Sequence, residues 1–410
     1  MKKAVTLFFL TAFFAFAAFA GDREMSGFAI PTARANGMGG AHTAYTDNVF
    51  GLLVNPAAIM RVEQRSFFAI SPALLSPEST ISLIGPIGKM VTSGGNTSAL
   101  GSATDILQKR HGKVPLGFDL REFPLSLAWV ADGFGFGLWN RVFVNPVILG
   151  TNIDVNVNAD VILPIGFAFR ILDTESHAVD AGLTIKPFVR ALASERVDIL
   201  DLAGGDYDFM NNLSAPVIAG AGFDMGFMYR WNKGLRAALT FSDIITRGIV
   251  VANISGTDSD TYYVPFTMNA GIAYDFKLEQ FWITAPRYLG TMGFTFAADW
   301  RDIMNIFQQD DYTKRNFLLN LSAGVQVSFM DTFMLRFGMN EMLPAVGVGF
   351  DLGPFEIDFA YYGREFGIEP GQLSAAAVDV TIAIRPGAKK RDWAWTRRSL
   401  VGLITRSPDL

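Results

Sequence analysis

Apolar and polar side chains alternate with a period of two over long stretches of the chain. The run 317–329 is the clearest example, and its apolar set contains no charged residue: Phe317, Leu319, Leu321, Ala323, Val325, Val327 and Phe329. The runs 221–230, 266–276 and 292–301 alternate in the same way. Successive side chains of a β-strand point to opposite faces, so each run predicts a strand with one wholly apolar face.

Turn residues divide this pattern into about fourteen predicted strands. They cover residues 66–86, 122–131, 133–148, 151–171, 178–199, 215–231, 234–250, 264–276, 288–302, 316–329, 332–341, 344–352, 354–365 and 373–385. We expect an all-β fold, a transmembrane antiparallel β-barrel in which one face of each strand meets lipid. A soluble β-sandwich would also alternate, but it would carry more Lys and Glu on its loops and edges.

The connections between the predicted strands differ in length at the two ends of the barrel. Short turns at 131–133, 173–176, 231–234, 330–331 and 353–354 alternate with long polar loops at 87–121, 200–214, 251–263 and 303–315, and 277–287 is a longer link on the short-turn side. Outer-membrane barrels have short periplasmic turns and long external loops. The pattern therefore predicts that both ends of the barrel domain, residues 66–385, lie on the periplasmic side.

The first twenty residues have the three parts of a cleaved secretory signal peptide. Lys2 and Lys3 precede an apolar run, and Ala18-Phe19-Ala20 supplies small residues at the cleavage site. We expect residues 1–20 to direct export and then to be removed, with an uncleaved anchor helix as the alternative. Export together with a lipid-facing barrel predicts the outer membrane of a Gram-negative-type envelope.

Composition and motifs exclude several classes of function. Of the 410 residues half are hydrophobic and only 18% are charged, with a net charge of −5 that argues against a nucleic-acid partner. The chain has no Cys, its three His are isolated, and it has no nucleophile elbow, so we expect no enzyme activity, no metal centre and no cofactor. The acidic stretch 198–208 either holds Ca²⁺ in an external loop or is simply solvated.

Residues 21–65 lack strand periodicity but contain an ordered series of motifs. These are Gly27-Phe28, then Ala35-Asn36-Gly37-Met38-Gly39-Gly40-Ala41, then Asp47-Asn48, and finally Asn55-Pro56-Ala57-Ala58-Ile59. The series resembles the N-terminus of the FadL/TodX family of outer-membrane transporters for long-chain fatty acids and other hydrophobic compounds. The resemblance implies a barrel of fourteen strands whose N-terminal segment folds inside as a hatch that plugs the lumen.

Seven residues are expected to shape this hatch: Gly27, Phe28, Gly39, Gly40, Asn55, Pro56 and Ala57. Pro56 fixes φ, and Asn55 can close a turn onto the following amides, so the Asn-Pro-Ala box starts a short helical turn. The glycines let the chain bend tightly against the barrel wall. A loosely held tail is the alternative, although tails rarely carry so many large apolar residues.

The third predicted strand contains Asn145-Pro146 near its outer half. A proline cannot donate to the strand ladder, and it pushes its predecessor away from regular pairing. In the family that the chain resembles, an inward kink of the third strand makes a lateral opening. The resemblance therefore implies a lateral gate at Asn145 and Pro146; a proline already in the outer loop is the alternative.

Charged residues fall on the parity that is predicted to face the lumen. They are Lys186, Arg190, Arg236 and Arg336 among Asp224, Asp275, Asp299, Glu356, Asp358 and Asp379. Most are expected to neutralise one another across the barrel. Lys186 and Arg190 share one face of the fifth strand, and we select them as contacts for the carboxylate of an acyl ligand.

The sequence thus predicts passive outer-membrane uptake of long-chain fatty acids or other hydrophobic small molecules. The alternative is a non-transporting barrel that serves as a structural or docking partner for surface or secretion components. Expected partners are outer-membrane lipid, the hydrophobic ligand and the barrel assembly machinery. After the last strand a basic segment, 386–410, is expected to form a periplasmic tail that is either an amphipathic helix or solvated chain.

Overall fold

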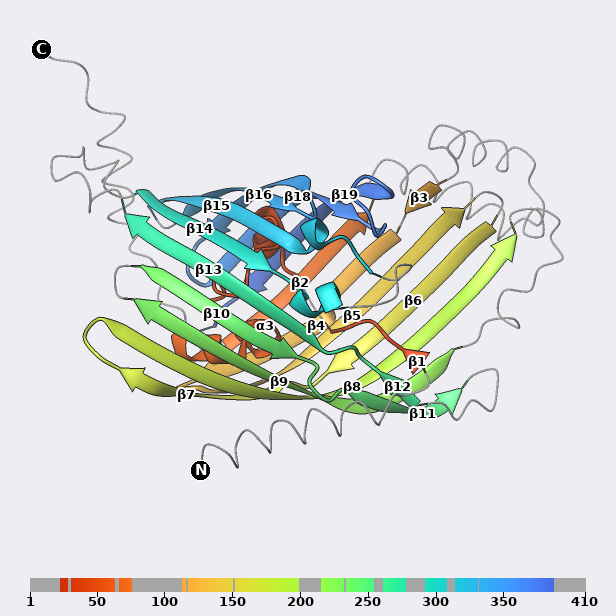
Figure 1. Cartoon of the computed structure of the whole chain (residues 1–410), viewed down its shortest axis with the longest axis horizontal. Coiled ribbons are helices and arrows are strands. Elements are labelled where there is room, and N and C mark those ends of the chain that lie inside the picture. Colours follow the sequence, from red (N-terminus) through yellow and green to blue (C-terminus); the bar gives the residue numbers. More distant parts are fainter. Residues whose placement is uncertain are drawn as a thin grey trace, which may run out of the picture.

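Hydrogen-bonded strands form one closed wall in the computed structural model of the chain (Figure 1). The structure describes residues 23–28, 31–62, 66–75, 113–115, 117–149, 152–198, 215–231, 234–253, 261–277, 292–307, 314–330 and 332–386. The predicted leader, most of the predicted long loops, Asp201, Asp206, Asp208 and the tail after Pro386 lie outside these residues.

Ten wall strands are uninterrupted. They are β2 (Ser66–Leu75), β5 (Phe134–Leu149), β8 (His177–Asp198), β9 (Pro216–Trp231), β14 (Met292–Trp300), β15 (Leu321–Phe329), β16 (Phe333–Asn340), β17 (Leu343–Asp351), β18 (Phe355–Glu365) and β19 (Ser374–Ile384).

Four further wall strands each consist of two described segments. They are β3 (Lys113–Pro115) with β4 (Gly117–Ala131), β6 (Asn152–Ile162) with β7 (Ile165–Asp173), β10 (Leu235–Ser242) with β11 (Arg247–Asn253), and β12 (Thr261–Tyr263) with β13 (Thr267–Lys277). All neighbours in the wall are antiparallel, and β19 pairs with β2 to close it. The wall is therefore a barrel of fourteen strands, the number that the turn residues predict.

Two predicted strands are interrupted in the structure. Pro164 separates β6 from β7 because it has no N–H to donate to the ladder. The main chain is held across the gap by hydrogen bonds from Leu163 N to Pro187 O at 2.9 Å and from Gly137 N to Pro164 O at 3.0 Å. The second interruption, at 243–246, separates β10 from β11.

The predicted strand 316–329 begins later than its alternation indicates. Residues Phe317–Asn320 form a 3₁₀ helix, η4, and the strand starts at Leu321. Asn316 caps η4, since its side-chain oxygen accepts a hydrogen bond from Leu318 N at 3.0 Å. Another 3₁₀ helix, η3 (Ile303–Phe307), follows β14. A local cap here outweighs the period-two pattern.

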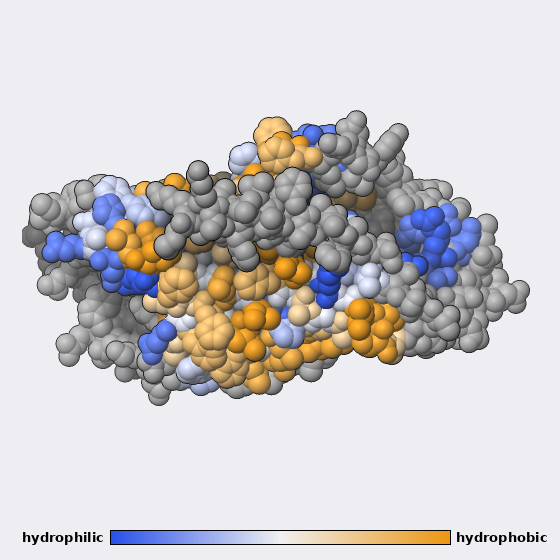
Figure 2. All heavy atoms as spheres, turned by 60° about the horizontal axis from the view of Figure 1, so that its bottom comes forward, coloured by the Kyte–Doolittle hydropathy of each residue, from blue (hydrophilic) through white to orange (hydrophobic). Residues whose placement is uncertain are grey.

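The outer face of the wall is apolar (Figure 2). Large side chains that remain exposed include Phe136, Phe167, Phe169, Ile185, Val189, Ile249, Ile272, Phe296, Phe337, Phe350, Phe359, Tyr361 and Ile382. Figure 2 shows apolar side chains gathered over the strands that lie at the bottom of Figure 1. An apolar belt of this kind is typical of a barrel surrounded by lipid.

Among the described residues, no helix combines the length and the apolar character needed to cross a membrane.

The inner face of the wall carries the charged residues, and they neutralise one another as expected. Arg336 is paired with Asp358 at 2.5 Å, and Arg121 is paired with Asp379 at 2.5 Å. Lys186 lies between two carboxylates. Because all of these groups are buried, each charge depends on its partner to offset the loss of water.

We predict that Phe359→Arg destabilises the barrel in lipid vesicles by about 2–4 kcal/mol, because Phe359 lies midway along β18 on the outer face. Phe355→Arg is the matched control. It lies on the same face at the short-turn end of β18, where the cost should fall to about 0–1 kcal/mol. Urea titration in vesicles measures both, and equal effects would contradict a bilayer around this face.

Candidate functional site

Residues 23–28 and 31–62, together called the inner segment below, lie inside the barrel against inward-facing side chains of its wall (Figure 1). Their regular elements are β1 (Arg23–Glu24), which pairs in parallel with β12, α2 (Ala33–Gly37), α3 (Gly51–Val54) and the 3₁₀ helix η1 (Pro56–Arg61). Met38, Leu52 and Asn55 have no exposed surface. The inner segment therefore packs as part of the protein core.

The Asn-Pro-Ala box starts η1. Asn55 is its N-cap, and the side-chain oxygen of Asn55 accepts a hydrogen bond from Ala57 N at 3.1 Å. The side-chain nitrogen Nδ2 of Asn55 donates a hydrogen bond to Thr43 O at 3.1 Å, which links two parts of the inner segment. Pro56 occupies the first turn, where a missing N–H costs nothing.

A wall glycine lets this box lie directly on the barrel. A Cβ at Gly182 in β8 would lie 2.3 Å from the carbonyl carbon of Pro56, so only a glycine permits the contact. Gly39 and Gly40 belong to the inner segment and likewise allow it to lie close to the wall. Both have positive φ, +69° and +83°, and a Cβ at Gly39 would lie 2.4 Å from Ala323 O of β15.

Two wall carboxylates hold the inner segment. Asp299 of β14 accepts hydrogen bonds from His42 N at 2.7 Å and from both Thr43 N and Thr43 Oγ1, at 2.7 and 2.8 Å. Asp379 of β19 accepts one from Asn36 Nδ2 at 2.7 Å. Sequence reasoning placed both aspartates in the lumen but missed these contacts, for which the chain has no local signal.

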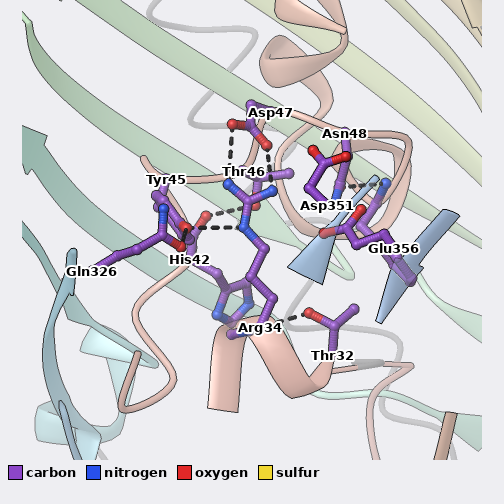
Figure 3. A network of polar contacts seen from close by, with 12 residues as sticks. Thr32, Arg34, His42, Tyr45, Thr46, Asp47, Asn48, Gln326, Asp351 and Glu356 are labelled. Atoms are coloured by element: carbon purple, nitrogen blue, oxygen red, sulfur yellow. Dashed lines mark hydrogen bonds and ion pairs between the residues drawn. The ribbon is translucent and has the colours of Figure 1, made fainter. Parts of the chain in front are cut away.

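A polar network links the inner segment to the wall through Arg34 (Figure 3). Arg34 forms a bidentate ion pair with Asp47, with N–O distances of 2.8 and 3.1 Å. Its Nε donates to Tyr45 Oη at 2.9 Å, and Tyr45 Oη donates in turn to Gln326 Oε1 at 2.6 Å. The same Gln326 oxygen accepts from Arg336 Nε at 2.7 Å, so the network reaches the charged pairs of the wall.

The electrostatics of this network favour its charged form. Burial by itself raises the pKa of Asp47, but the guanidinium groups of Arg34, Arg61 and Arg236 together outweigh burial and lower that pKa to about 2. Burial lowers the pKa of His42, so its imidazole is neutral at pH 7. A cavity of about 30 Å³ beside the network, lined only by residues of the inner segment, has room for about one water molecule.

The structure places the predicted hatch residues Gly27 and Phe28 next to the predicted carboxylate contacts or their partners. The ring of Phe28 lies over Arg190, with the guanidinium carbon 4.2 Å from the ring centre, and Lys186 Nζ is 5.9 Å from the same centre. Gly27 lies next to Asp243. Phe28 therefore packs on the two cations that were selected as ligand contacts.

Both cations already have partners. Lys186 Nζ is 2.8 Å from Asp224 and 2.9 Å from Asp243. Arg190 pairs with Asp160 through two hydrogen bonds of 2.6 and 2.8 Å, and its Nη1 donates to the backbone oxygen of Ser26. An acyl carboxylate would have to displace a wall carboxylate, so the arrangement does not favour these residues as a vacant anion site.

Backbone pairing does not support a gap at Asn145 and Pro146. The β5–β6 ladder runs through both residues without a register shift. On the other side of β5, the pairs made by Val144 and Val147 keep one register. The register of β4 shifts against both neighbours across 122–126 instead. The lateral gate stays a prediction without support from the strand pairing.

Within the described part of the chain, no three His, Cys, Asp or Glu residues come together as a metal site. The chemistry that this arrangement offers is binding and closure: an apolar interface between the inner segment and the wall, framed by paired charges.

One family model matches part of the sequence. It is described as "F plasmid transfer operon, TraF, protein" and matches residues 102–287, less than half of the chain. No curated protein matches the chain.

The barrel is similar to solved structures that are remote in sequence. The Ralstonia pickettii toluene transporter TbuX is 14% identical, with 87% of this chain and 97% of that chain covered at a TM-score of 0.46. A Pseudomonas aeruginosa FadL homologue is 11% identical, with 89% and 100% covered at 0.45. The Pseudomonas putida toluene transporter TodX is 11% identical, with 89% and 98% covered at 0.44. Likeness at this level says nothing of a ligand.

Proposed function

We propose that the protein is an outer-membrane channel for hydrophobic small molecules, closed by the inner segment until that segment shifts. The observation that carries the proposal is an apolar cluster shared by the segment and the wall. The segment contributes Met25, Phe28, Val49, Phe50, Leu52, Leu53 and Ile59, and the wall contributes residues that include Val130, Trp139, Ile162, Phe188 and Ile218.

The wall half of this apolar cluster would bind the ligand once the inner segment has moved away. If the inner segment withdraws, the wall half of the cluster becomes an apolar pocket flanked by charged pairs. An apolar ligand that fills it regains roughly 25 cal/mol for each Å² it removes from water. No energy source is needed, since a ligand and the inner segment compete for the same surface.

The inner segment is held by interactions that can be exchanged. Its polar contacts are three hydrogen bonds to Asp299 and one to Asp379, each worth about 0.5–1.5 kcal/mol in net terms, or up to about 3 when the acceptor is charged. Water or a ligand can replace such bonds. The wall is held instead by the antiparallel main-chain pairing of its strands, which a ligand cannot replace.

A second candidate function is a docking role in a transfer or secretion apparatus. The match of residues 102–287 to a family named after a plasmid-transfer protein favours it. Under this function the inner segment would be a permanent part of the core, and no hydrophobic compound would pass. An uptake measurement separates the two candidates.

The channel proposal predicts that a Gram-negative host without its own fatty-acid transporter takes up radiolabelled oleate or toluene when it makes this protein. Phe188→Asp places a carboxylate in the apolar cluster and should lower that uptake at least about tenfold, whereas Phe188→Leu should preserve it. Heat-modifiable migration on gels verifies that each barrel is folded. An inserted wild-type barrel that confers uptake of neither compound would favour the docking function.

Displacing the inner segment should open the lumen to small polar solutes. In Gly182→Ala the new methyl group meets the backbone of Pro56, which can move only with the segment. We expect severalfold faster swelling of liposomes in arabinose. Gly293→Ala is the matched control, because its methyl group meets Ser328 Oγ, a side chain that can rotate. Wild-type swelling rates in both variants would contradict closure by the segment.

Acid should loosen the inner segment. The pKa of Asp47 is lowered to about 2 in the folded protein, so the Arg34 pair stabilises the closed state fully above about pH 4 and loses its effect as the pH falls through about 2. The Asp47 side chain is 36% exposed and solvent screens the pair, so we expect about a fivefold rise in channel opening, equivalent to about 1 kcal/mol. Planar-bilayer recordings measure it. Asp47→Asn should show this rise already at pH 7 and lose the acid response.

A further inference from the structure

A recess of about 330 Å³ opens at the short-turn end of the barrel. The β7–β8 turn, the β9–β10 turn and β13 supply its walls, and Arg61, the last residue of η1, supplies its inner side. It is therefore built from both the wall and the inner segment, at the end of the lumen opposite the long loops.

Among the described residues, four arginines line this recess, and three of them have carboxylate partners. Arg170 and Arg230 share Asp180, at 2.9 and 2.6 Å, and Arg170 also pairs with Asp173, the last residue of β7. Arg236 pairs with Asp275 at 2.6 Å. These three cations belong to the wall and are neutralised by it.

Arg61 is different. It takes part in none of the ion pairs among the described residues, and its Nη1 is buried without a hydrogen-bond partner there. The Nε atoms of Arg230 and Arg236 are also buried without a hydrogen-bond acceptor. Burial and the neighbouring Arg236 lower the pKa of Arg61 to about 10, and the carboxylates of Asp47 and Asp275, neither of which forms an ion pair with it, offset only part of this effect. Buried donors without a partner are costly, so a hydrogen-bond acceptor next to Arg61 would stabilise this arrangement.

We propose that this recess binds a small organic carboxylate, with its oxygens accepting hydrogen bonds from Arg61 and from the free donors of Arg230 and Arg236. The proposal rests on the proposed channel function and adds to it an anion site at the short-turn mouth of the lumen.

Charge and shape favour a carboxylate over a phosphate. Among the described residues of the recess, one cation lacks an ion pair, which matches one negative charge, and Asp173, Glu175 and Asp275 line the same recess and would repel a dianion. Trp231 contributes an aromatic surface, and 330 Å³ accommodates a compact aromatic acid. Because Arg61 ends the inner segment, a bound anion would also hold that end of the segment in place.

The test is calorimetric titration of the detergent-solubilised full-length protein with benzoate, benzamide and inorganic phosphate. We expect wild-type protein to bind benzoate but not neutral benzamide, and Arg61→Gln to weaken benzoate binding at least about tenfold. Arg196→Gln is the matched control. This arginine is 70% exposed, pairs with Asp154 near the long-loop end of β8, and should leave benzoate binding unchanged.

Equal benzoate affinity in wild type and Arg61→Gln overturns the site, as does the absence of benzoate binding to wild type or tighter binding of phosphate than of benzoate. If Arg61→Gln does not assemble, Arg236→Gln provides the same readout, because it removes a second donor of the recess. Oleate or toluene uptake is measured separately. Uptake without benzoate binding would overturn the anion site and leave the channel function standing. Benzoate binding without uptake would overturn the channel function and leave the anion site standing.

Discussion

The closure of the wall, where β19 pairs with β2, is the constraint on which the rest of the structure depends. The outer face is apolar, so its surroundings offer the backbone no hydrogen-bond partners, and an open sheet edge would leave a row of N–H and C=O groups unpaired. Closure removes both edges at once. It also gives every strand an inner and an outer face, so that successive side chains point alternately to the apolar exterior and to the lumen.

The charges of the lumen follow from that division. Polar residues excluded from the outer face are confined inside, where water is scarce, and they pair: Arg336 with Asp358, Arg121 with Asp379, Lys186 with Asp224 and Asp243. Removing one partner of such a pair would leave an uncompensated buried charge, which is typically far more costly than losing the pair as a whole. Asp379 bonds Arg121 and Asn36 together, and so the network that neutralises the wall also anchors the inner segment.

The inner segment is stabilised by the barrel rather than by itself. Its helices have only five and four residues, and helices of that length are unstable alone in water. They persist because Thr32 caps α2, because Asn55 caps η1, and because wall glycines such as Gly182 admit their backbone. An element held to the wall by caps, a few hydrogen bonds and apolar contact is suited to move while the wall stays fixed, which is the physical basis of the proposed channel.

Features that depend on near neighbours along the chain could be predicted from the residues alone. Period-two alternation gave fourteen strands and the inward parity of Lys186, Arg190 and Asp299, and the Asn55-Pro56 box indicated a capped turn. Sequence reasoning misjudged 317–320, where a cap outweighs alternation, and it suggested a gap at Pro146 that the ladder does not support. Which charges meet depends instead on the folded arrangement of the chain. The pairing of Arg190 with Asp160, the contact of Phe28 with Arg190, and the unpaired donor of Arg61 depend on strand register and on where the inner segment lies. These contacts join residues far apart in the chain, and a local periodicity cannot predict which distant residues come into contact.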